Sequence, residues 1–409
     1  MKENLKVITN LSISKLIFNY RKKVRGVVEN LEIESDANLH KYFVHLKSKY
    51  QEALLQANKA DLHSLAEQAM EQGVISISEK TILPPSGCDR DYLSFAPYYY
   101  VNENTNPLTK SRETVQHRDS RSNPFLASIS DKPKLAQVCA RLHAVSLSYR
   151  DTPSNDKIEF IESQIKTWFI NENTAMTPHM EFAQIMPWTG NKYGLGIIDS
   201  RWLLLAIEAC ALVVDKLTLE TLHGFKVWLR EFAKWILSSK SGLTEVARKN
   251  NRGSWVDVLL AYILLFLNEE RCVALIVDHT LKNRFEIQFD NNGDQPFELT
   301  RYNPVSYSLY NYYPIKYILQ IDELINSQGN REKKITMNKT ISRLEAAITC
   351  HERGSIEHID FKLSKNLNLY YPYSFAQIAT FPAVMPLTSN AKTPVPNKSN
   401  TPAKSIVSS

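Results

Sequence analysis

Long apolar runs, clustered cysteines and nucleotide-binding glycine motifs are all missing from this sequence. No stretch of about 18 residues is both apolar and uncharged, so no membrane span is predicted. The five cysteines of the 409 residues are odd in number, lie far apart and form no CxxC pair. This pattern argues against a disulfide framework and a zinc site. Cys139, Cys210 and Cys272 fall in apolar helical patterns, and we expect them in the core.

Signals for export, metals and nucleotides are lacking as well. Residues 1–25 are broken by Asn, Lys and Arg and contain no clean apolar segment with a small-residue cleavage site, so no secretory signal is predicted. Histidines such as His143 and His223 are isolated, without HxxE or HxH spacing, and predict neither a metal nor another cofactor. Gly194 and Gly196 fit neither GxGxxG nor GxxxxGK, which excludes the common nucleotide sites.

The composition is that of a globular protein with a mild positive charge. Hydrophobic residues make up 43% and charged residues 22%, and the net charge is +6. The basic residues are scattered rather than run together, which argues against nucleic acid as a partner. The positive charge suits an anionic polymer as substrate, although it is equally explained by solubility.

Helical periodicity dominates the middle of the chain. Apolar residues recur at three- and four-residue spacing, whereas no alternating series is long enough to build a sheet. The expected helices are 133–150, 157–171, 199–216, 218–239, 254–268, 270–284, 305–326 and 338–350. This pattern predicts an all-α fold of paired antiparallel helices, either a bundle or a helical toroid.

The chain divides by composition into four segments. Residues 1–78 are polar and helix-prone and form a helical N-terminal extension. Residues 79–350 are the main helical domain, which starts with a Pro-, Gly- and Tyr-rich ordered loop over 81–125. Residues 351–387, with short extended pieces over 360–384, complete the same domain, and the Ser-, Thr-, Asn- and Pro-rich residues 388–409 are expected to be a disordered tail.

Two clusters of polar residues offer the richest chemistry. The first is Asn250-Asn251-Arg252 with Trp255, at a junction before an apolar helix, where an asparagine can equally be an N-cap. The second is the segment 294–311, which contains Arg301, Tyr302 and Tyr307, and whose tyrosine stripe can equally belong to the core. Two amides, two guanidiniums and a phenol are the groups that can hold a carboxylate and move a proton beside it.

Seven short motifs occur in an order that resembles the alginate lyase domain. They are PPSG at 84–87, DYLSFAPYYY at 91–100, Asn123-Pro124, AQIMP at 183–187, GIIDSR at 196–201, NNRGSW at 250–255, and DQPFELTR at 294–301 followed by YSLYN at 307–311. The resemblance covers roughly residues 75–330. It implies an (α/α) toroid, or incomplete barrel of antiparallel helix pairs, that cleaves uronic-acid polymers by β-elimination without a cofactor. It also implies an exported protein, with which the N-terminus does not agree.

The resemblance assigns roles by position. Asn251 matches the asparagine that helps neutralise the substrate carboxylate, Arg301 an arginine near the same group, and Tyr307 the tyrosine that transfers the proton. Relatives commonly carry His where this chain has Arg252. Arginine is permanently charged, so it can neutralise a carboxylate but cannot act as a base near neutral pH. The expected substrate-binding residues are Tyr99, Tyr100, Gln184, Asn250, Trp255 and Tyr302.

Stereochemistry then predicts a substrate preference. In mannuronate and glucuronate, H5 and O4 lie on the same face of the ring, so one tyrosine can take the first proton and return it to O4. In guluronate they lie on opposite faces, and two groups are needed. The expected substrate is therefore polymannuronate or glucuronan, with poor action on polyguluronate.

Two other functions compete with this interpretation. Arg252 and the missing signal also fit a family member that binds acidic glycans without cutting them. A helical glycoside hydrolase would need two carboxylates across a cleft, for which Asp199, Asp257 and Glu298 are the candidates. Their positions are more typical of helix caps or of side chains that support other site residues.

Overall fold

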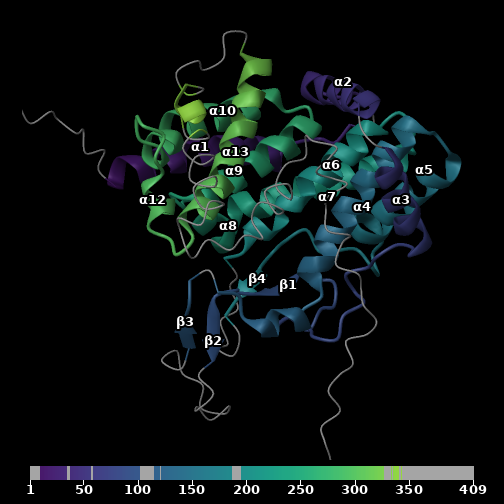
Figure 1. Ribbon diagram of the computed structural model, residues 1–409, viewed down its shortest axis with the longest axis horizontal. Helices are drawn as coiled ribbons and strands as arrows, with labels where there is room; N and C mark the ends of the chain where they lie inside the picture. Colours follow the sequence, from purple (N-terminus) through teal and green to yellow (C-terminus); the bar gives the residue numbers. More distant parts are fainter. Residues whose placement is uncertain are drawn as a thin grey trace, which may run out of the picture.

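The computed structural model describes residues 10–34, 37–56, 59–101, 115–119, 121–186, 195–326, 333, 335–339 and 342. A large body of helices lies on one side, and four short strands lie together beneath it (Figure 1). The predictions for 351–387 and for the tail 388–409 lie outside the described residues. Within the described residues, no helix has the length and apolarity that a membrane crossing requires.

The described elements are mostly helices, as the periodicity predicts. The α-helices are α1 (Asn10–Glu29), α2 (Lys41–Gln56), α3 (Lys59–Glu71), α4 (Asp131–Asp151), α5 (Asn155–Ile165), α6 (Leu203–Leu212), α7 (Leu219–Ser238), α8 (Lys240–Val246), α9 (Asn251–Phe266), α10 (Glu270–His279), α11 (Phe285–Gln288), α12 (Pro296–Leu299) and α13 (Pro304–Ile325). The strands are β1 (Leu93–Phe95), β2 (Tyr99–Val101), β3 (Val115–His117) and β4 (Phe182–Ile185). A 3-10 turn over Ile197–Trp202 leads into α6, and single π-helical turns extend α5 and α10.

Helix α9 runs through the centre of the helical body. It packs against α6, α7, α8, α10 and α13, and every residue from Gly253 to Phe266 is buried. A helix that is apolar on all sides is stable only when it is covered on all sides. The continuous apolar run of this segment therefore fixes α9 as the axis around which the other helices are placed.

The N-terminal helices share the core of the main domain. Val24 of α1, Phe43 of α2 and Leu62 of α3 are almost fully buried in the same apolar cluster as the residues of α9. Helix α1 contacts α7 and α10, and α3 contacts α4. Cys139, Cys210 and Cys272 are buried in this cluster too, which confirms the prediction made for them.

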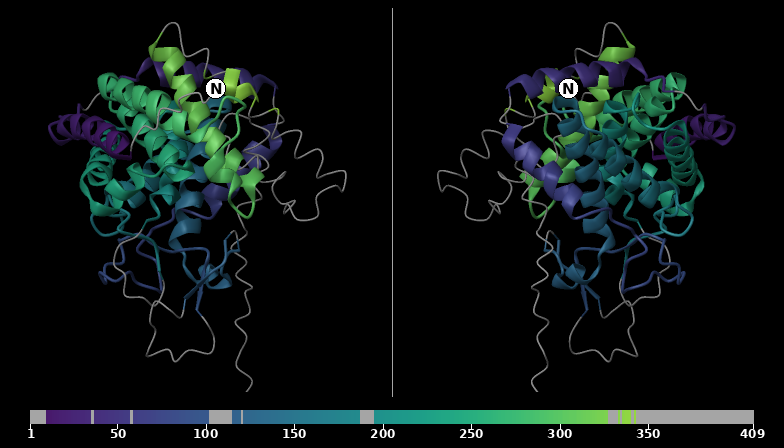
Figure 2. Two further views of the ribbon diagram at one scale, coloured as in Figure 1. Left: turned by 90° about the vertical axis from the view of Figure 1, so that its left-hand side faces the viewer. Right: turned by 90° about the vertical axis from the view of Figure 1, so that its right-hand side faces the viewer.

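The strands are too short to be found by an alternation of apolar and polar residues. β1 pairs in parallel with β4, and β2 pairs antiparallel with β3, with Tyr99 opposite His117. Each strand has three or four residues. The loop predicted over 81–125 therefore contains three strands, β1, β2 and β3, for which the sequence has no recognisable pattern. The strands project from one side of the helical body (Figure 2).

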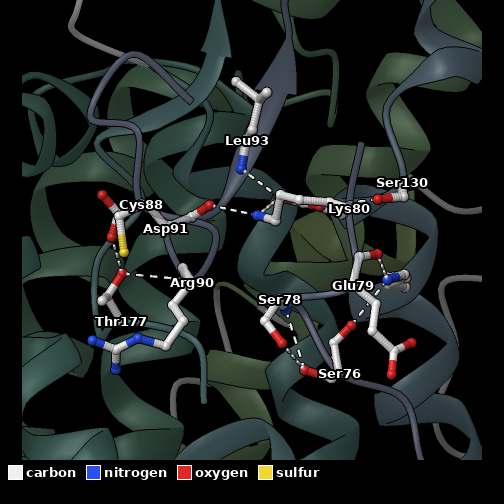
Figure 3. A network of polar contacts seen from close by, with 12 residues as sticks. Ser76, Ser78, Glu79, Lys80, Cys88, Arg90, Asp91, Leu93, Ser130 and Thr177 are labelled. Atoms are coloured by element: carbon white, nitrogen blue, oxygen red, sulfur yellow. Dashed lines mark hydrogen bonds and ion pairs between the residues drawn. The ribbon is translucent and has the colours of Figure 1, made fainter. Parts of the chain in front are cut away.

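A buried ion pair joins these strands to the helices. Lys80 Nζ lies 2.5 Å from Asp131 Oδ2, and both side chains are about 1% exposed. The same carboxylate oxygen accepts the Leu93 N–H at 2.8 Å, and Lys80 also donates to the Asp91 carbonyl (Figure 3). Burial raises the pKa of Asp131, and Lys80 opposes that effect. This pair fixes the start of α4 against β1.

Candidate functional site

A cavity of about 590 Å³ lies between the helical body and the strands. Its helical wall carries Asn251, Arg252, Arg301 and Tyr307, and its strand wall includes Tyr99. The volume is within the range of ordinary ligand sites. The four residues predicted to carry the chemistry therefore meet in one hollow, although Asn251 and Arg252 lie about fifty positions before Arg301 and Tyr307 in the sequence.

Asn250 and Asn251 have different positions at the start of α9. Asn250 is the N-cap, and its side chain accepts the Arg252 N–H, so the capping interpretation holds for this residue while it also lines the cavity. Asn251 is 2% exposed, and its amide nitrogen lies 3.0 and 2.9 Å from the two carboxylate oxygens of Glu298. Glu298 also accepts the Asn251 backbone N–H at 2.8 Å. Glu298 thus fixes the orientation of this amide.

The junction between α8 and α9 is closed by an arginine. Arg284 is paired with Asp257 at 2.6 Å and donates to the carbonyls of Val246 and Arg248. A Cβ on Gly253 would lie 2.2 Å from Arg284 Nη1 and 2.3 Å from the Arg248 oxygen. Only glycine leaves room for this bridge, which explains the glycine of the NNRGSW motif.

Arg252 is held from behind by a buried carboxylate. Its Nε donates to Glu245 at 2.7 Å, and Glu245 is fully buried whereas Arg252 is 25% exposed. Burial raises the pKa of Glu245, and the charges of Arg252 and Arg248 work against that effect. Arg252 Nη2 is buried without a hydrogen-bond partner among the described residues. Nη2 is therefore not accessible from the cavity, which Arg252 lines with the exposed part of its side chain.

Arg301 lies against Tyr307 and is held by Asp119. Its Nη2 and Nε bond the two Asp119 oxygens at 2.5 and 3.1 Å, and its guanidinium carbon is 3.7 Å from the centre of the Tyr307 ring. Burial alone would lower the pKa of Arg301, but Asp119 and the tyrosines around it raise it above its usual value. The Tyr307 hydroxyl lies 2.5 Å from the Tyr98 hydroxyl. A permanent cation and a second phenol thus surround the predicted proton-transfer group.

The other predicted binding residues separate into two groups. Tyr99 and Gln184 line the cavity. The other three predicted binding residues, Tyr100, Trp255 and Tyr302, do not line the cavity. The Tyr100 hydroxyl donates to the carbonyls of Arg121 and Ser122, Trp255 is buried with its indole N–H on the Tyr310 carbonyl, and Tyr302 is 58% exposed outside the cavity.

Several residues in or beside the cavity were not predicted from the sequence. His117 and Lys132 lie in it, and Tyr98 and Asp119 contact its reactive side chains. Tyr98 and Asp119 belong to segments that the sequence marks only as polar or tyrosine-rich loops. The pairing of Tyr99 with His117 brings the imidazole to the cavity, and no signal in the sequence announces that pairing.

The three carboxylates considered for a hydrolase serve other partners. Asp257 pairs with Arg284, Glu298 accepts from Asn251, and Asp199 accepts from Ser94 and Gln184. Each is about 1% exposed or less. Among the described residues, no group of three His, Cys, Asp or Glu side chains is arranged to hold a metal ion.

The chain belongs to the alginate lyase family, a family of polysaccharide lyases, because the family model for alginate lyase matches residues 76–345. The structure is similar to the crystal structure of an alginate lyase from Bacteroides ovatus, with a TM-score of 0.69 and 21% sequence identity. That match covers 81% of this chain and 88% of the other. It confirms the predicted (α/α) fold. No curated protein matches the chain significantly.

Proposed function

We propose that the protein is a polysaccharide lyase that cleaves an acidic uronan by β-elimination, with Tyr307 as the proton-transfer group. The observation that carries the proposal is the placement of Tyr307 under the Arg301 guanidinium and beside Tyr98, in a cavity that also contains Arg252. Membership of the alginate lyase family supports the substrate class.

The proposed reaction needs charge neutralisation first. Removal of H5 beside an ionised carboxylate places further negative charge on that group, so fixed cations facing it stabilise the enolate as it forms. Arg252 and Arg301 can both supply this charge, because each keeps guanidinium N–H groups beyond those paired with Glu245 and Asp119. The Asn251 amide lines the same cavity, with its nitrogen held by Glu298.

The proton then passes through Tyr307. Its phenolate takes H5, the C5–H electrons form the C4=C5 double bond, and the C4–O4 bond breaks. The Tyr307 phenol returns the proton to O4 of the leaving sugar. A phenol with a free pKa of about 10 ionises more readily beside a positive charge and a hydrogen-bond donor. Arg301 and the Tyr98 hydroxyl are those two groups.

His117 bears on the predicted substrate preference. One tyrosine suffices for mannuronate and glucuronate, whereas guluronate needs a second group on the opposite face of the ring. His117 is an imidazole on the strand wall, facing a cavity whose helical wall holds Tyr307. Polymannuronate or glucuronan remains the proposed substrate, and any action on polyguluronate should depend on His117.

The second candidate is a family member that binds acidic glycans without cleaving them. It rests on Arg252, which cannot be a base and which stands where the family resemblance predicts His. Under the lyase proposal Arg252 only neutralises charge, so the loss of His is tolerated. Turnover therefore separates the two functions.

The test is the ultraviolet absorbance of the unsaturated C4=C5 uronate during incubation with polymannuronate, glucuronan and polyguluronate. We expect absorbance to rise on the first two, and Tyr307→Phe to lower the rate by at least about 100-fold while binding persists. His117→Asn should lower only any activity on polyguluronate. Binding without any rise, in a folded protein, would favour the glycan-binding function. Equal rates on all three polymers in His117→Asn would overturn the role given to His117 and the proposed substrate preference.

A further inference from the structure

A second polar cluster lies in the same cavity as Tyr307. Its centre is Asp199, which is 1% exposed. The Asp199 carboxylate accepts from Ser94 Oγ at 2.7 Å, Gln184 Nε2 at 2.9 Å and the Tyr92 hydroxyl at 3.2 Å, and Lys132 Nζ lies 3.3 Å away. Burial works to raise the pKa of Asp199, but Lys132 and the hydrogen bonds lower it below its usual value. The carboxylate is therefore ionised and fully occupied.

Lys132 faces the cavity from this cluster. Its side chain is 44% exposed and lines the hollow, although its ammonium also reaches Asp199. An ammonium group has three protons, and one of them suffices for Asp199. The residue before it, Asp131, pairs with Lys80 and accepts the Leu93 N–H, so the first turn of α4 has a fixed position. The backbone that carries the Lys132 ammonium group is therefore held in place.

Gln184 is held in a strained conformation at the same place. Its φ is 50°, a left-handed value that residues other than glycine rarely adopt. Its backbone N–H donates to Ser94 and its side-chain amide to Asp199, which leaves the amide oxygen for other donors. Strain of this kind persists only where the surroundings impose it, and it is concentrated at functional sites.

We propose that Lys132 and Gln184 form a binding site for a second acidic sugar of the same polymer. Lys132 pairs with the carboxylate of that sugar, and the Gln184 oxygen accepts from one of its hydroxyl groups. Asp199 positions both side chains. This inference rests on the proposed lyase function for its substrate class and adds a residue that selects an acidic neighbour for the sugar being cleaved.

The cluster has no group suited to proton transfer at its exposed side. Lys132 is a cation, Gln184 an amide, and the buried Asp199 is surrounded by donors. Its contribution is therefore expected in substrate affinity. Because Asp199 offsets part of the Lys132 charge, we expect a moderate effect of about tenfold on binding, and a small effect on kcat.

Calorimetric binding tests the proposal in the Tyr307→Phe background, where turnover is suppressed. The probes are a saturated tetrauronate and 4-O-methyl glucuronate, which has one carboxylate and fills only the reaction end. Lys132→Met should weaken the tetrauronate about tenfold and leave the monosaccharide unchanged, while Lys132→Arg retains most of the affinity. Lys47→Met is the matched control, because Lys47 forms a 3.3 Å pair with Asp215 outside the cavity.

The outcomes are distinct from those of the lyase assay. Equal weakening of both probes by Lys132→Met, or no weakening of the tetrauronate, would overturn the second sugar site even if the enzyme is active. Selective weakening of the tetrauronate supports it even if no polymer is cleaved. If Lys132→Met does not fold, Lys132→Gln takes its place with the same expected result.

Discussion

The two polar clusters of the cavity, called below the Tyr307 end and the Lys132 end, use cations in different ways. At the Tyr307 end, Arg301 touches the phenol that we propose as the proton-transfer group, and its partner Asp119 is 24% exposed. At the Lys132 end, the partner Asp199 is buried and the cation faces side chains that do not change protonation. A positive charge beside a reacting group lowers a barrier, whereas one beside a bound group raises affinity. The ends should therefore differ in which kinetic constant they control.

The largest expected effect comes from Arg301→Gln. Losing a fixed cation at the developing charge should lower kcat by about 10²–10³ with little change in KM. Steady-state kinetics on polymannuronate measure this. Arg118→Gln is the control, because the Arg118 guanidinium lies over the Tyr100 ring and Arg118 does not line the cavity. A change confined to KM would show that the two ends do not differ as proposed.

A stability effect comes next, from Arg252→His. It introduces the imidazole that the family resemblance predicts at this position but leaves the buried Glu245 without its closest cation, so the free energy of unfolding should fall by about 1.5–3 kcal/mol. Adding Glu245→Gln should recover part of the loss, since the lone buried charge is gone. Urea unfolding of both variants measures it. A double variant less stable than the single one would contradict the pairing.

The smallest effect concerns the pH dependence of the Asp119–Arg301 pair. The hydrogen bonds from Arg301 lower the Asp119 pKa in the folded protein, although burial opposes them. A lowered pKa means that the stabilisation is complete above the unfolded value of about 4 and disappears as pH falls through the folded one. Both groups are partly exposed, so the contribution is at most about 1 kcal/mol.

Thermal unfolding of the wild type and of Asp119→Asn measures this window. The gap in Tm should be constant above about pH 5 and close at lower pH. A gap that widens on acidification would show that Asp119 is not stabilised in its ionised form.

Sequence periodicity predicted the helical body because long amphipathic or wholly apolar segments have few alternative structures. The segment of α9 is the clearest case, since its apolar run requires burial on every side. Four catalytic candidates were likewise brought together as the motif order indicates, and they line one cavity.

The strand wall could not be predicted in the same way. His117, Tyr98 and Asp119 reach the site through a three-residue pairing and through contacts with α13 or the segment before it, which are long-range features without a local pattern. Trp255 shows that a residue within a matching motif need not line the site. A tryptophan inside a functional motif is buried in the core, because its side of the helix start faces Tyr310.

Gly196 sets a limit on how this cavity can be redesigned. A Cβ there would lie 2.5 Å from Gln184 Cγ and 2.8 Å from the Ala183 carbonyl carbon, so the strained strand end and the segment behind it are closed tightly on each other. Directed evolution aimed at a wider polymer channel will therefore find position 196 closed to substitution. New specificities should be sought at Lys132, whose exposed end has room to vary.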